Sequence, residues 1–396
     1  MFHPRLASVR PLPLLVRLRP DHCRMNPVRV TPAAARRFLR RALLLDAPAP
    51  DIATVLAHHG YIQIDPINVC GRMHDLILRH RVRDYREGGL MRHLHGDGPP
   101  LAAAARTAFE HHLPTGHTLV ALTLDAWPHL LSEMRHRTRR NGAWSGRLSP
   151  RQKGIAVRIN TEIAARGPLS SEDFADTGRS RAVWGSATQA KTTLQKLFFH
   201  GRLLIARRGE DNHRYYDLPE RVLPAAILKL PEPAKSATAR WEILLKLRQR
   251  RLVLLKRKEL PLVEDLVQAV QIESCPLLHC LHVDLPWFDR STLPPAPSTA
   301  AGPLLLAPLD PLIYDRRVTS ALWNFDYTWE AYTPPPKRRR GYYALPVLAG
   351  TEIVGHVDPK ADRPARRLRV MARAVKRGHQ LTGALDGLAR FLGLRR

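Results

Sequence analysis

The feature that most constrains this fold is a regular order of helix and strand signals in the middle of the chain, from Ser149 to Pro224. Apolar spacing and capping residues predict three successive helices, over residues 151–166, 168–174 and 186–200. A glycine then ends the third helix, and a turn-rich linker joins two strand-like segments, 202–208 and 213–217. The middle of the chain is therefore expected to form three helices and a two-stranded hairpin.

Three helices followed by a two-stranded hairpin are the order of a winged helix, whose third helix normally enters the major groove of DNA. In the segment 186–200, one apolar stripe leaves the polar side chains facing outward. Among these, Lys191, Gln195 and Lys196 are predicted to contact phosphates or base edges. An ordinary solvated helix face explains the same side chains equally well.

The charge of the chain narrows the choice of partner. Among 396 residues, 63 Lys and Arg stand against 35 Asp and Glu, which gives a formal net charge of +28. Such a charge predicts a polyanionic partner, with double-stranded DNA as the leading candidate. A coding bias toward arginine is the alternative explanation of the charge.

Cysteine usage and hydropathy exclude several other classes of protein. The four cysteines are scattered, which favours a reducing compartment over a disulfide framework. The cluster of Cys275, His279, Cys280 and His282 lacks a second ligand pair at zinc-site spacing, so we expect no metal and no cofactor. No apolar run approaches the roughly 20 residues that span a bilayer. We therefore expect a cytoplasmic, nucleoid-associated monomer.

Composition and element signals divide the chain into five expected segments. They are a disordered extension (1–26), a first winged-helix unit (27–145), a second unit (146–228), a third, degraded unit (236–295) and a C-terminal domain (303–396). The last segment changes to strand-like alternation and closes with an amphipathic helix. The predicted fold class is α+β, with tandem winged-helix domains followed by a small C-terminal β-rich, barrel-like domain.

The first unit contains the two side chains that we expect to carry chemistry. Alternation along a short strand places Gln63 and Asp65 on one face, while Ile62 and Ile64 point to the core. An adjacent amide and carboxylate can hold one water for attack on an oxocarbenium-like sugar. The alternative is structural, because Asp65 before Pro66 is also a good N-cap for a third helix.

A second candidate region joins basic and aromatic residues. A basic run is flanked by tyrosines that include Tyr342, and its members are Lys337, Arg338, Arg339 and Arg340. This combination suits phosphates and exposed bases, although a charge run is also typical of a solvated loop. Farther along, Asp358, Lys360 and Asp362 are expected to be paired charges at the end of a surface hairpin.

Taken in order, these segments resemble the AlkZ/YcaQ-like winged-helix DNA glycosylases. The resemblance extends from about Val30 to the C-terminus. It is carried by the segments 63–65, 202–208, 216–224, 305–316, 324–327, 330–334, 337–343 and 355–362.

The resemblance implies tandem winged helices and a β-barrel-like domain around a basic DNA channel. It also implies a monofunctional DNA glycosylase that acts on N7-alkylated guanine and interstrand crosslinks, with Gln63 and Asp65 as the catalytic Gln-x-Asp motif. The chain departs from its relatives after His111, where a His-(Asp/Glu)-Ala-Ser type segment is usual and residues 112–117 are His-Leu-Pro-Thr-Gly-His. This departure favours the alternative, a winged-helix DNA-binding or regulatory protein without catalysis.

Overall fold

The computed structural model describes residues 26–177, 179–182, 185–209, 212–289 and 302–396. The expected extension at residues 1–26 lies outside these ranges except for its last residue, and so do the final residues of the expected third unit.

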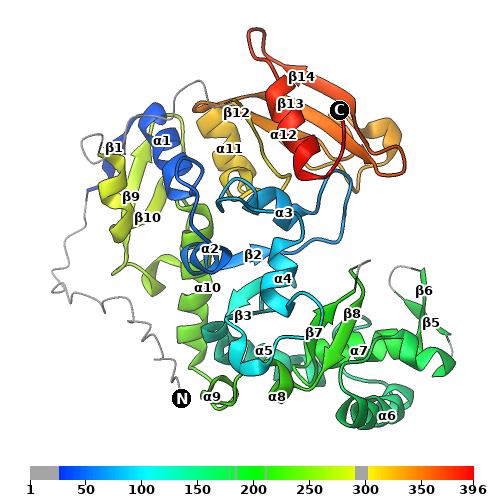
Figure 1. The fold of residues 1–396 in the computed structure, drawn as a ribbon. Helices are drawn as coiled ribbons and strands as arrows, with labels where there is room; N and C mark the ends of the chain where they lie inside the picture. The colour runs from blue at the N-terminus through cyan, green and yellow to red at the C-terminus, as the bar shows by residue number, and fades with distance from the viewer. Residues whose placement is uncertain (1–25, 178, 183–184, 210–211, 290–301) are drawn as a thin grey trace, which may run out of the picture.

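The described residues form an α+β fold of helices and small sheets (Figure 1). The α-helices are α1 (Pro32–Ala42), α2 (Ile52–His59), α3 (Met73–Leu78), α4 (Gly89–His95), α5 (Trp127–Arg139), α6 (Pro150–Arg166), α7 (Gln189–Phe199), α8 (Pro219–Val222), α9 (Ala225–Leu228), α10 (Lys235–Arg250), α11 (Arg316–Trp323) and α12 (Thr382–Phe391). The short 3-10 helices are η1 (Ala103–Ala105), η2 (Leu124–Ala126), η3 (Glu172–Thr177), η4 (Leu260–Leu262), η5 (His282–Phe288), η6 (Pro311–Ile313) and η7 (Pro335–Lys337).

The described strands pair antiparallel, with one exception. They are β1 (Val28–Val30), β2 (Tyr61–Gln63), β3 (Ala108–His112), β4 (Leu119–Thr123), β5 (Arg179–Ala182), β6 (Gly185–Thr188), β7 (Leu204–Arg208), β8 (Arg214–Asp217), β9 (Val267–Ile272), β10 (Leu278–Leu281), β11 (Leu304–Leu305), β12 (Leu345–Ala349), β13 (Glu352–Asp362) and β14 (Arg367–Val375). Their sheets have the orders β1-β9-β10, β2-β4-β3, β5-β6, β7-β8 and β11-β12-β13-β14. The exception is β1, which runs parallel to β9 from the far side of the chain.

Local capping residues explain the first helices. The Thr31 side chain accepts from the backbone N–H of Ala34 at the start of α1, and Asp51 does the same for Thr54 at the start of α2. Gly60 ends α2 with a φ of +83°, a conformation that favours glycine.

The middle of the chain has the predicted order of elements, with one added hairpin. A capping box starts α6, and η3, α7 and the β7–β8 hairpin follow it. The expected helix start at residue 186 is wrong, because residues 185–188 form β6 and Thr188 caps α7 through the N–H of Lys191. Leu194, Leu197 and Phe198 form the buried stripe of α7.

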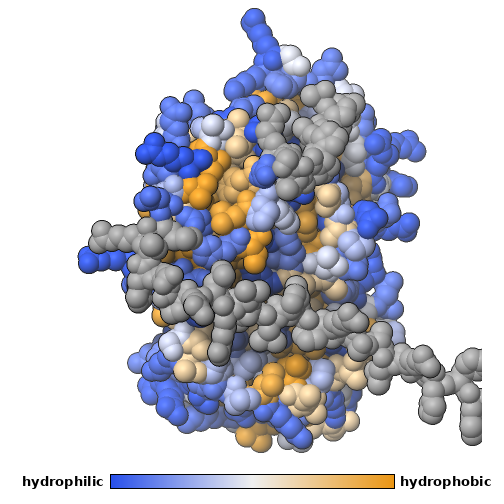
Figure 2. All heavy atoms as spheres, turned by 90° about the vertical axis from the view of Figure 1, so that its left-hand side faces the viewer, coloured by the Kyte–Doolittle hydropathy of each residue, from blue (hydrophilic) through white to orange (hydrophobic). Residues whose placement is uncertain are grey.

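Segments that are far apart in the sequence share one core. The pairing of β1 with β9 brings α1 beside η5, where the rings of Phe38 and Phe288 stack with centroids 4.0 Å apart. On the face of the molecule that carries α1, β9 and α10, hydrophobic side chains appear between hydrophilic ones (Figure 2). Exposed apolar residues such as Val283 and Leu277 are ordinary for a protein surface.

The C-terminal sheet packs against the segment that follows β2. Cys70, Met73 and Ile77 share a buried cluster with Tyr343 and other side chains of the C-terminal sheet and α12. The backbone N–H of Ala361 in β13 also donates to the carbonyl of Val69 at 2.9 Å. This sheet is open, with β11 and β14 at its edges in the described residues, so the expected barrel-like closure is not observed.

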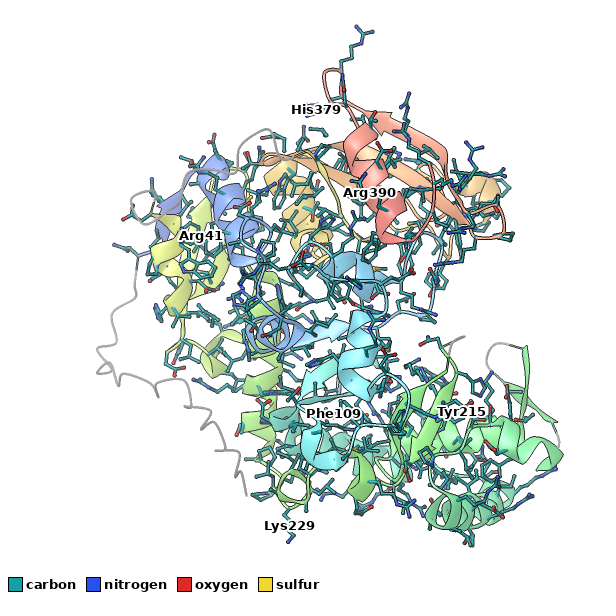
Figure 3. The ribbon with its side chains drawn as sticks, in the orientation of Figure 1. Arg41, Phe109, Tyr215, Lys229, His379 and Arg390 are labelled. Atoms are coloured by element: carbon teal, nitrogen blue, oxygen red, sulfur yellow. The ribbon has the colours of Figure 1, made fainter. Side chains whose placement is uncertain are left out.

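The labelled side chains give the layout of these parts. Figure 3 labels Arg390 on α12 in the upper part, Phe109 on β3 of the sheet β2-β4-β3 (the central sheet), Tyr215 on the β7–β8 hairpin and Lys229 at the lower end. In the same orientation, Figure 1 shows β2 between the C-terminal sheet above it and the β7–β8 hairpin below it.

Candidate active site

The pair Gln63 and Asp65 lies where β2 ends. Gln63 is the last residue of this strand, and Asp65 follows after Ile64 in irregular backbone. Ile62 and Ile64 are 0% and 4% exposed, which confirms that this side of the alternation faces the core. Gln63 and Asp65 are both half-buried.

The prediction that Asp65 and Pro66 open a helix is wrong. The Asp65 Oδ1 atom accepts from the backbone N–H of Ile67 at 2.9 Å, which closes an Asx turn around Pro66. The next helix, α3, begins only at Met73. The intervening residues instead hydrogen-bond to β13 and pack against the C-terminal sheet, which gives their backbone a tertiary partner in place of a helical one.

The surroundings of Asp65 alter its charge state. Burial raises the pKa of this carboxyl, and the hydrogen bond from Ile67 only partly offsets the shift. Burial also raises the pKa of Tyr332 and Tyr343, with a further contribution from the Asp65 carboxylate to both. The two tyrosines therefore lie within electrostatic reach of Asp65, although they come from the far end of the chain.

Three buried polar atoms of Gln63 and of the aromatic residues discussed with Asp65 have no hydrogen-bond partner among the described residues. They are Gln63 Oε1, the Tyr343 hydroxyl and Trp329 Nε1. The Trp329 ring joins the two tyrosines, with centroids 5.7 Å from Tyr332 and 5.9 Å from Tyr343. Buried polar groups without partners are uncommon in folded proteins and mark places where water or a ligand can bind.

Two carboxylates fold the basic run into a fixed loop. Glu330 accepts from the backbone N–H groups of Arg339, Arg340 and Gly341 at 2.8–3.2 Å. Burial opposes the charge of Glu330, but these N–H donors hold its pKa below the ordinary value. Asp358 accepts from the next two N–H groups, each at 3.0 Å. The expectation that Asp358 is a surface residue is wrong, because this inward role buries it.

The basic side chains of this loop divide into two kinds. Arg338 donates to the carbonyl of Thr333 at 2.8 Å, and its guanidinium lies 4.8 Å from the centre of the Tyr342 ring. Arg340 donates to the carbonyl of Asp326. Lys337 and Arg339 are exposed, as is Tyr342. Only part of the predicted basic run is thus directed to solvent.

The predicted contact residues of α7 also divide. Lys191 is exposed and Gln195 is half-buried. The prediction that Lys196 faces outward is wrong, because this residue is only 6% exposed and its amine donates to the carbonyl of Arg147 at 2.8 Å and to Gln152 Oε1 at 3.2 Å. Gln152 belongs to the capping box of α6, so the lysine is part of a buried polar contact between helices.

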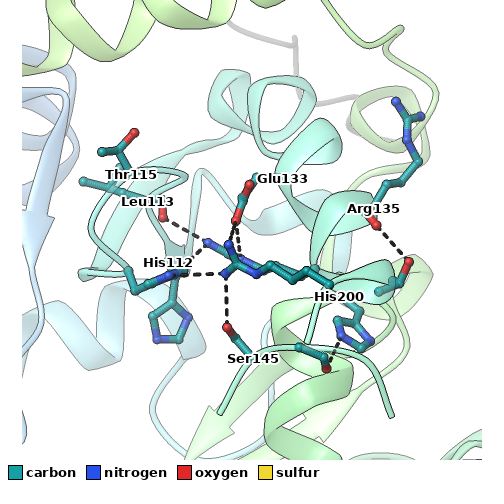
Figure 4. A network of polar contacts seen from close by, with 12 residues as sticks. His112, Leu113, Thr115, Glu133, Arg135, Ser145 and His200 are labelled. Carbon is teal, nitrogen blue, oxygen red and sulfur yellow. Dashed lines mark hydrogen bonds and ion pairs between the residues drawn. The ribbon is translucent and has the colours of Figure 1, made fainter. Parts of the chain in front are cut away.

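The segment that departs from the relatives lies at the same end of the central sheet as Asp65. His112 pairs with Leu119, and the N–H of Ile64 donates to the carbonyl of Leu119 at 2.9 Å. Figure 4 shows how α5 holds this turn. The guanidinium of Arg137 donates to the carbonyl of Leu113 at 3.2 Å and to Glu133 at 3.1 Å. The segment 112–117 therefore contains a turn that is held by a hydrogen bond from Arg137 on α5.

None of the helices in the described ranges combines the length and hydropathy needed to cross a membrane. Within those same ranges, no three or more His, Cys, Asp or Glu side chains are grouped so that they could hold a metal ion.

The sequence model of the family described as DNA glycosylase AlkZ-like matches residues 56–392. Among solved structures, the Streptomyces sahachiroi DNA glycosylase AlkZ is similar, with a TM-score of 0.54 and 15% sequence identity over 93% of this chain and 98% of that chain. At this identity the structural match indicates a common fold. The family match covers most of the chain and confirms the resemblance inferred from its residues: the chain belongs to the AlkZ-like DNA glycosylase family.

Proposed function

We propose that this DNA glycosylase hydrolyses the N-glycosidic bond of N7-alkylated purines in duplex DNA, interstrand crosslinks included, and does so with water as the nucleophile. The family membership supports a base-removing enzyme of DNA repair. The proposal of water-mediated hydrolysis is carried by the pair Gln63 and Asp65. Asp65 is a half-buried carboxylate with a raised pKa, and the buried Oε1 atom of Gln63 has no partner in the described part of the chain.

In this mechanism the two side chains divide the work on one water molecule. Gln63 Oε1 accepts a hydrogen bond from the water and orients it. Asp65 accepts its proton and stabilises the positive charge that develops on the sugar. An N7-alkylated purine is already cationic, so it leaves without protonation. One carboxylate is then sufficient, and no lysine needs to form a covalent intermediate with the sugar.

The raised pKa suits Asp65 for this role. Desolvation makes a carboxylate a stronger base, and it strengthens the attraction to a nearby cation. The hydrogen bond from the Ile67 N–H uses Oδ1 alone, and Oδ2 takes no part in it. The turn around Pro66 can therefore fix the carboxylate while one oxygen stays available to water.

The rest of the chain would supply the DNA contacts. We propose tandem winged-helix units within residues 27–295 and a monomeric enzyme that holds the duplex between them and the C-terminal domain. Lys191 and Gln195 on α7, together with Lys337, Arg338, Arg339, Arg340 and Tyr342, are the proposed contact residues. The exposed Lys337 and Arg339 are best placed among the loop cations, since Arg338 and Arg340 also hold backbone carbonyls.

The substitution Asp65→Asn tests the assignment. Asparagine retains an Oδ1 acceptor for the Ile67 N–H, so the turn is preserved while the charge and the basicity are lost. We expect single-turnover release of N7-methylguanine to fall roughly 10²-fold or more, the scale of general-base and charge-stabilising effects. Gln63→Ala should fall less, because it removes only the orientation of water.

Binding measurements with the same variants separate chemistry from recognition. Duplex affinity should stay close to that of the wild type. A wild-type release rate in folded Asp65→Asn protein would show that another group performs the chemistry. A wild-type protein that binds duplex DNA containing N7-methylguanine but never releases the base would support the non-catalytic alternative.

A further inference from the structure

A cavity of about 600 Å³ lies beside the segment that carries Asp65. Asn68 and Val69, three and four residues after Asp65, form one side. The other side belongs to the C-terminal domain and includes Arg338, Tyr342 and Met371. The cavity therefore joins the proposed catalytic segment to the basic loop and to the edge strand β14.

Met371 owes its position to an irregularity in the sheet. In the pairing of β13 with β14, Asp358 lies opposite Ala372 and Pro359 lies opposite Val370, which leaves Met371 as an extra residue. Proline has no backbone N–H to donate, so prolines within sheets occur at such bulges. A β-bulge changes the direction of the side chain that it carries. Here it places an apolar side chain at the cavity with 59% of its surface exposed.

The surroundings of Met371 are cationic and aromatic. Arg338 and Lys360 line the same cavity, and Arg373 is exposed two residues along the same strand. Tyr342 presents a ring whose one side is covered by the Arg338 guanidinium. A large exposed apolar side chain within a basic surface is complementary to duplex DNA, which offers phosphates on the outside and base faces within the stack.

We propose that Met371 is a wedge that enters the base stack of the duplex beside the damaged nucleotide. Apolar side chains that enter between base steps unstack them and kink the duplex, and methionine is among the residues used. Its unbranched, flexible side chain adapts to the gap that it opens. Arg338 and Lys360 would hold the phosphates around that gap.

The wedge would present the damaged nucleotide to the segment that follows β2. Met371 and Asn68 line one cavity, and Asn68 lies in the turn segment that Asp65 begins. Partial unstacking at this point would expose the sugar carbon to a water held by Gln63 and Asp65. This inference rests on the proposed function for the position of the lesion, but it makes a separate claim about the shape of the DNA.

The experiment reports unstacking without requiring base release. 2-Aminopurine, whose fluorescence is quenched by stacking, is placed next to an N7-methylguanine on a 2′-fluoro sugar, which resists hydrolysis because fluorine disfavours the oxocarbenium ion. Saturating wild-type enzyme should raise the fluorescence. Met371→Ala should lose most of that rise, whereas Met371→Leu, which retains an apolar side chain, should keep it.

Two controls make the result specific. Val157→Ala removes an apolar side chain that is at least as exposed (68%) from α6, outside the cavity, and should leave the fluorescence rise unchanged. Asp65→Asn should also keep the rise, so failure of the catalytic assignment and failure of the wedge are distinguishable. A full fluorescence rise with folded, saturating Met371→Ala protein would overturn the proposal, and so would an equal loss in Val157→Ala.

Discussion

Asp65 closes the turn around Pro66, and the proposed mechanism gives the same side chain a chemical role that its titration can test. Burial raises its pKa above the ordinary 3.8. Because the proposed mechanism needs the ionised carboxylate, base release should decline on acidification at a higher pH than an unperturbed aspartate would give. A pH profile of single-turnover release checks this expectation. A rate that stays constant down to pH 4 in folded enzyme would contradict it.

The same shift predicts that Asp65 reduces the stability of the fold at neutral pH. A carboxyl group whose pKa is raised by folding favours the folded state most when protonated, below its unfolded pKa. This contribution is lost as the pH rises through the folded pKa. Asp65→Asn, which carries no charge, should therefore unfold at the same or a higher temperature than the wild type at pH 7. A substantially lower melting temperature would show that the charge stabilises the turn.

The basic loop that carries Lys337 to Tyr342 depends on the backbone conformation of Gly341. Its φ of +124° favours glycine, and a Cβ atom there would collide with the carboxylate of Asp358. Gly341→Ala should cost about 1–3 kcal/mol of unfolding free energy, the range for a strained backbone conformation. Urea titration measures the change. Gly383→Ala in α12, where a Cβ meets nothing within 4 Å, is the matched control and should be neutral or stabilising.

At the scale of elements, a buried ion pair joins β3 to the β7–β8 hairpin. Arg208 binds both oxygens of Glu110, and His95 contacts the same carboxylate at 2.9 Å. Arg208 also holds the carbonyl and the side chain of Asn212 in the hairpin turn. Burial opposes the charge of Glu110, but Arg208 keeps its pKa well below the ordinary value. One carboxylate thus fixes the hairpin relative to the central sheet.

Removing one partner of this pair should be costly. Glu110→Ala would leave the buried guanidinium without its countercharge, and we expect a loss of about 3–5 kcal/mol in unfolding free energy. Glu162→Ala, which breaks the exposed pair with Arg166 on α6, should change stability by less than about 1 kcal/mol. Chemical denaturation of both variants checks the contrast. Similar losses in the two would show that the buried pair adds no structural constraint.

The elements that the sequence predicts well are those fixed by nearby residues. Asp51 and Gly60 define α2 within one short segment, so its bounds are predictable from capping preferences alone. Where a side chain is buried by a partner that is distant in sequence, the local sequence pattern does not predict its burial. Arg81 is an example, because it is fully buried and pairs with Asp310, 229 residues away. Lys196 turns inward for the same reason, since one of its acceptors, Gln152 Oε1, belongs to α6 and the other, the Arg147 carbonyl, lies just before that helix.

The candidate site follows the same rule. Alternation along β2 places Gln63 and Asp65 on one face, because the two side chains are neighbours in sequence, whereas their expected catalytic role comes from the family resemblance. The aromatic side chains beside them come from residues about 270 positions later, and no local pattern connects the two segments. The tyrosines of the basic loop could be suspected from composition, but Trp329 could not. Nor does spacing alone predict that Glu330 and Asp358 shape this loop.

At the scale of the whole molecule, the net charge of +28 predicts tight duplex binding that weakens steeply with salt, because phosphate contacts release counterions. The structure allows part of this salt dependence to be assigned to particular residues. If the basic loop contacts phosphates, its exposed members should account for part of the salt dependence, whereas cations elsewhere should act only through the overall field. Lys337 and Arg339 are the exposed members.

The double substitution of Lys337 and Arg339 by alanine tests this distinction. Losing two phosphate contacts should reduce the slope of log affinity against log salt by about 2. The matched control is the double substitution of Lys229 and Lys235 by alanine, which removes the same charge from exposed positions near α9 and α10 (Figure 3). Salt titrations of duplex binding should leave the control slope close to wild type. Equal changes in the two double variants would mean that the loop contributes only net charge, and would return it to the class of solvated surface loops.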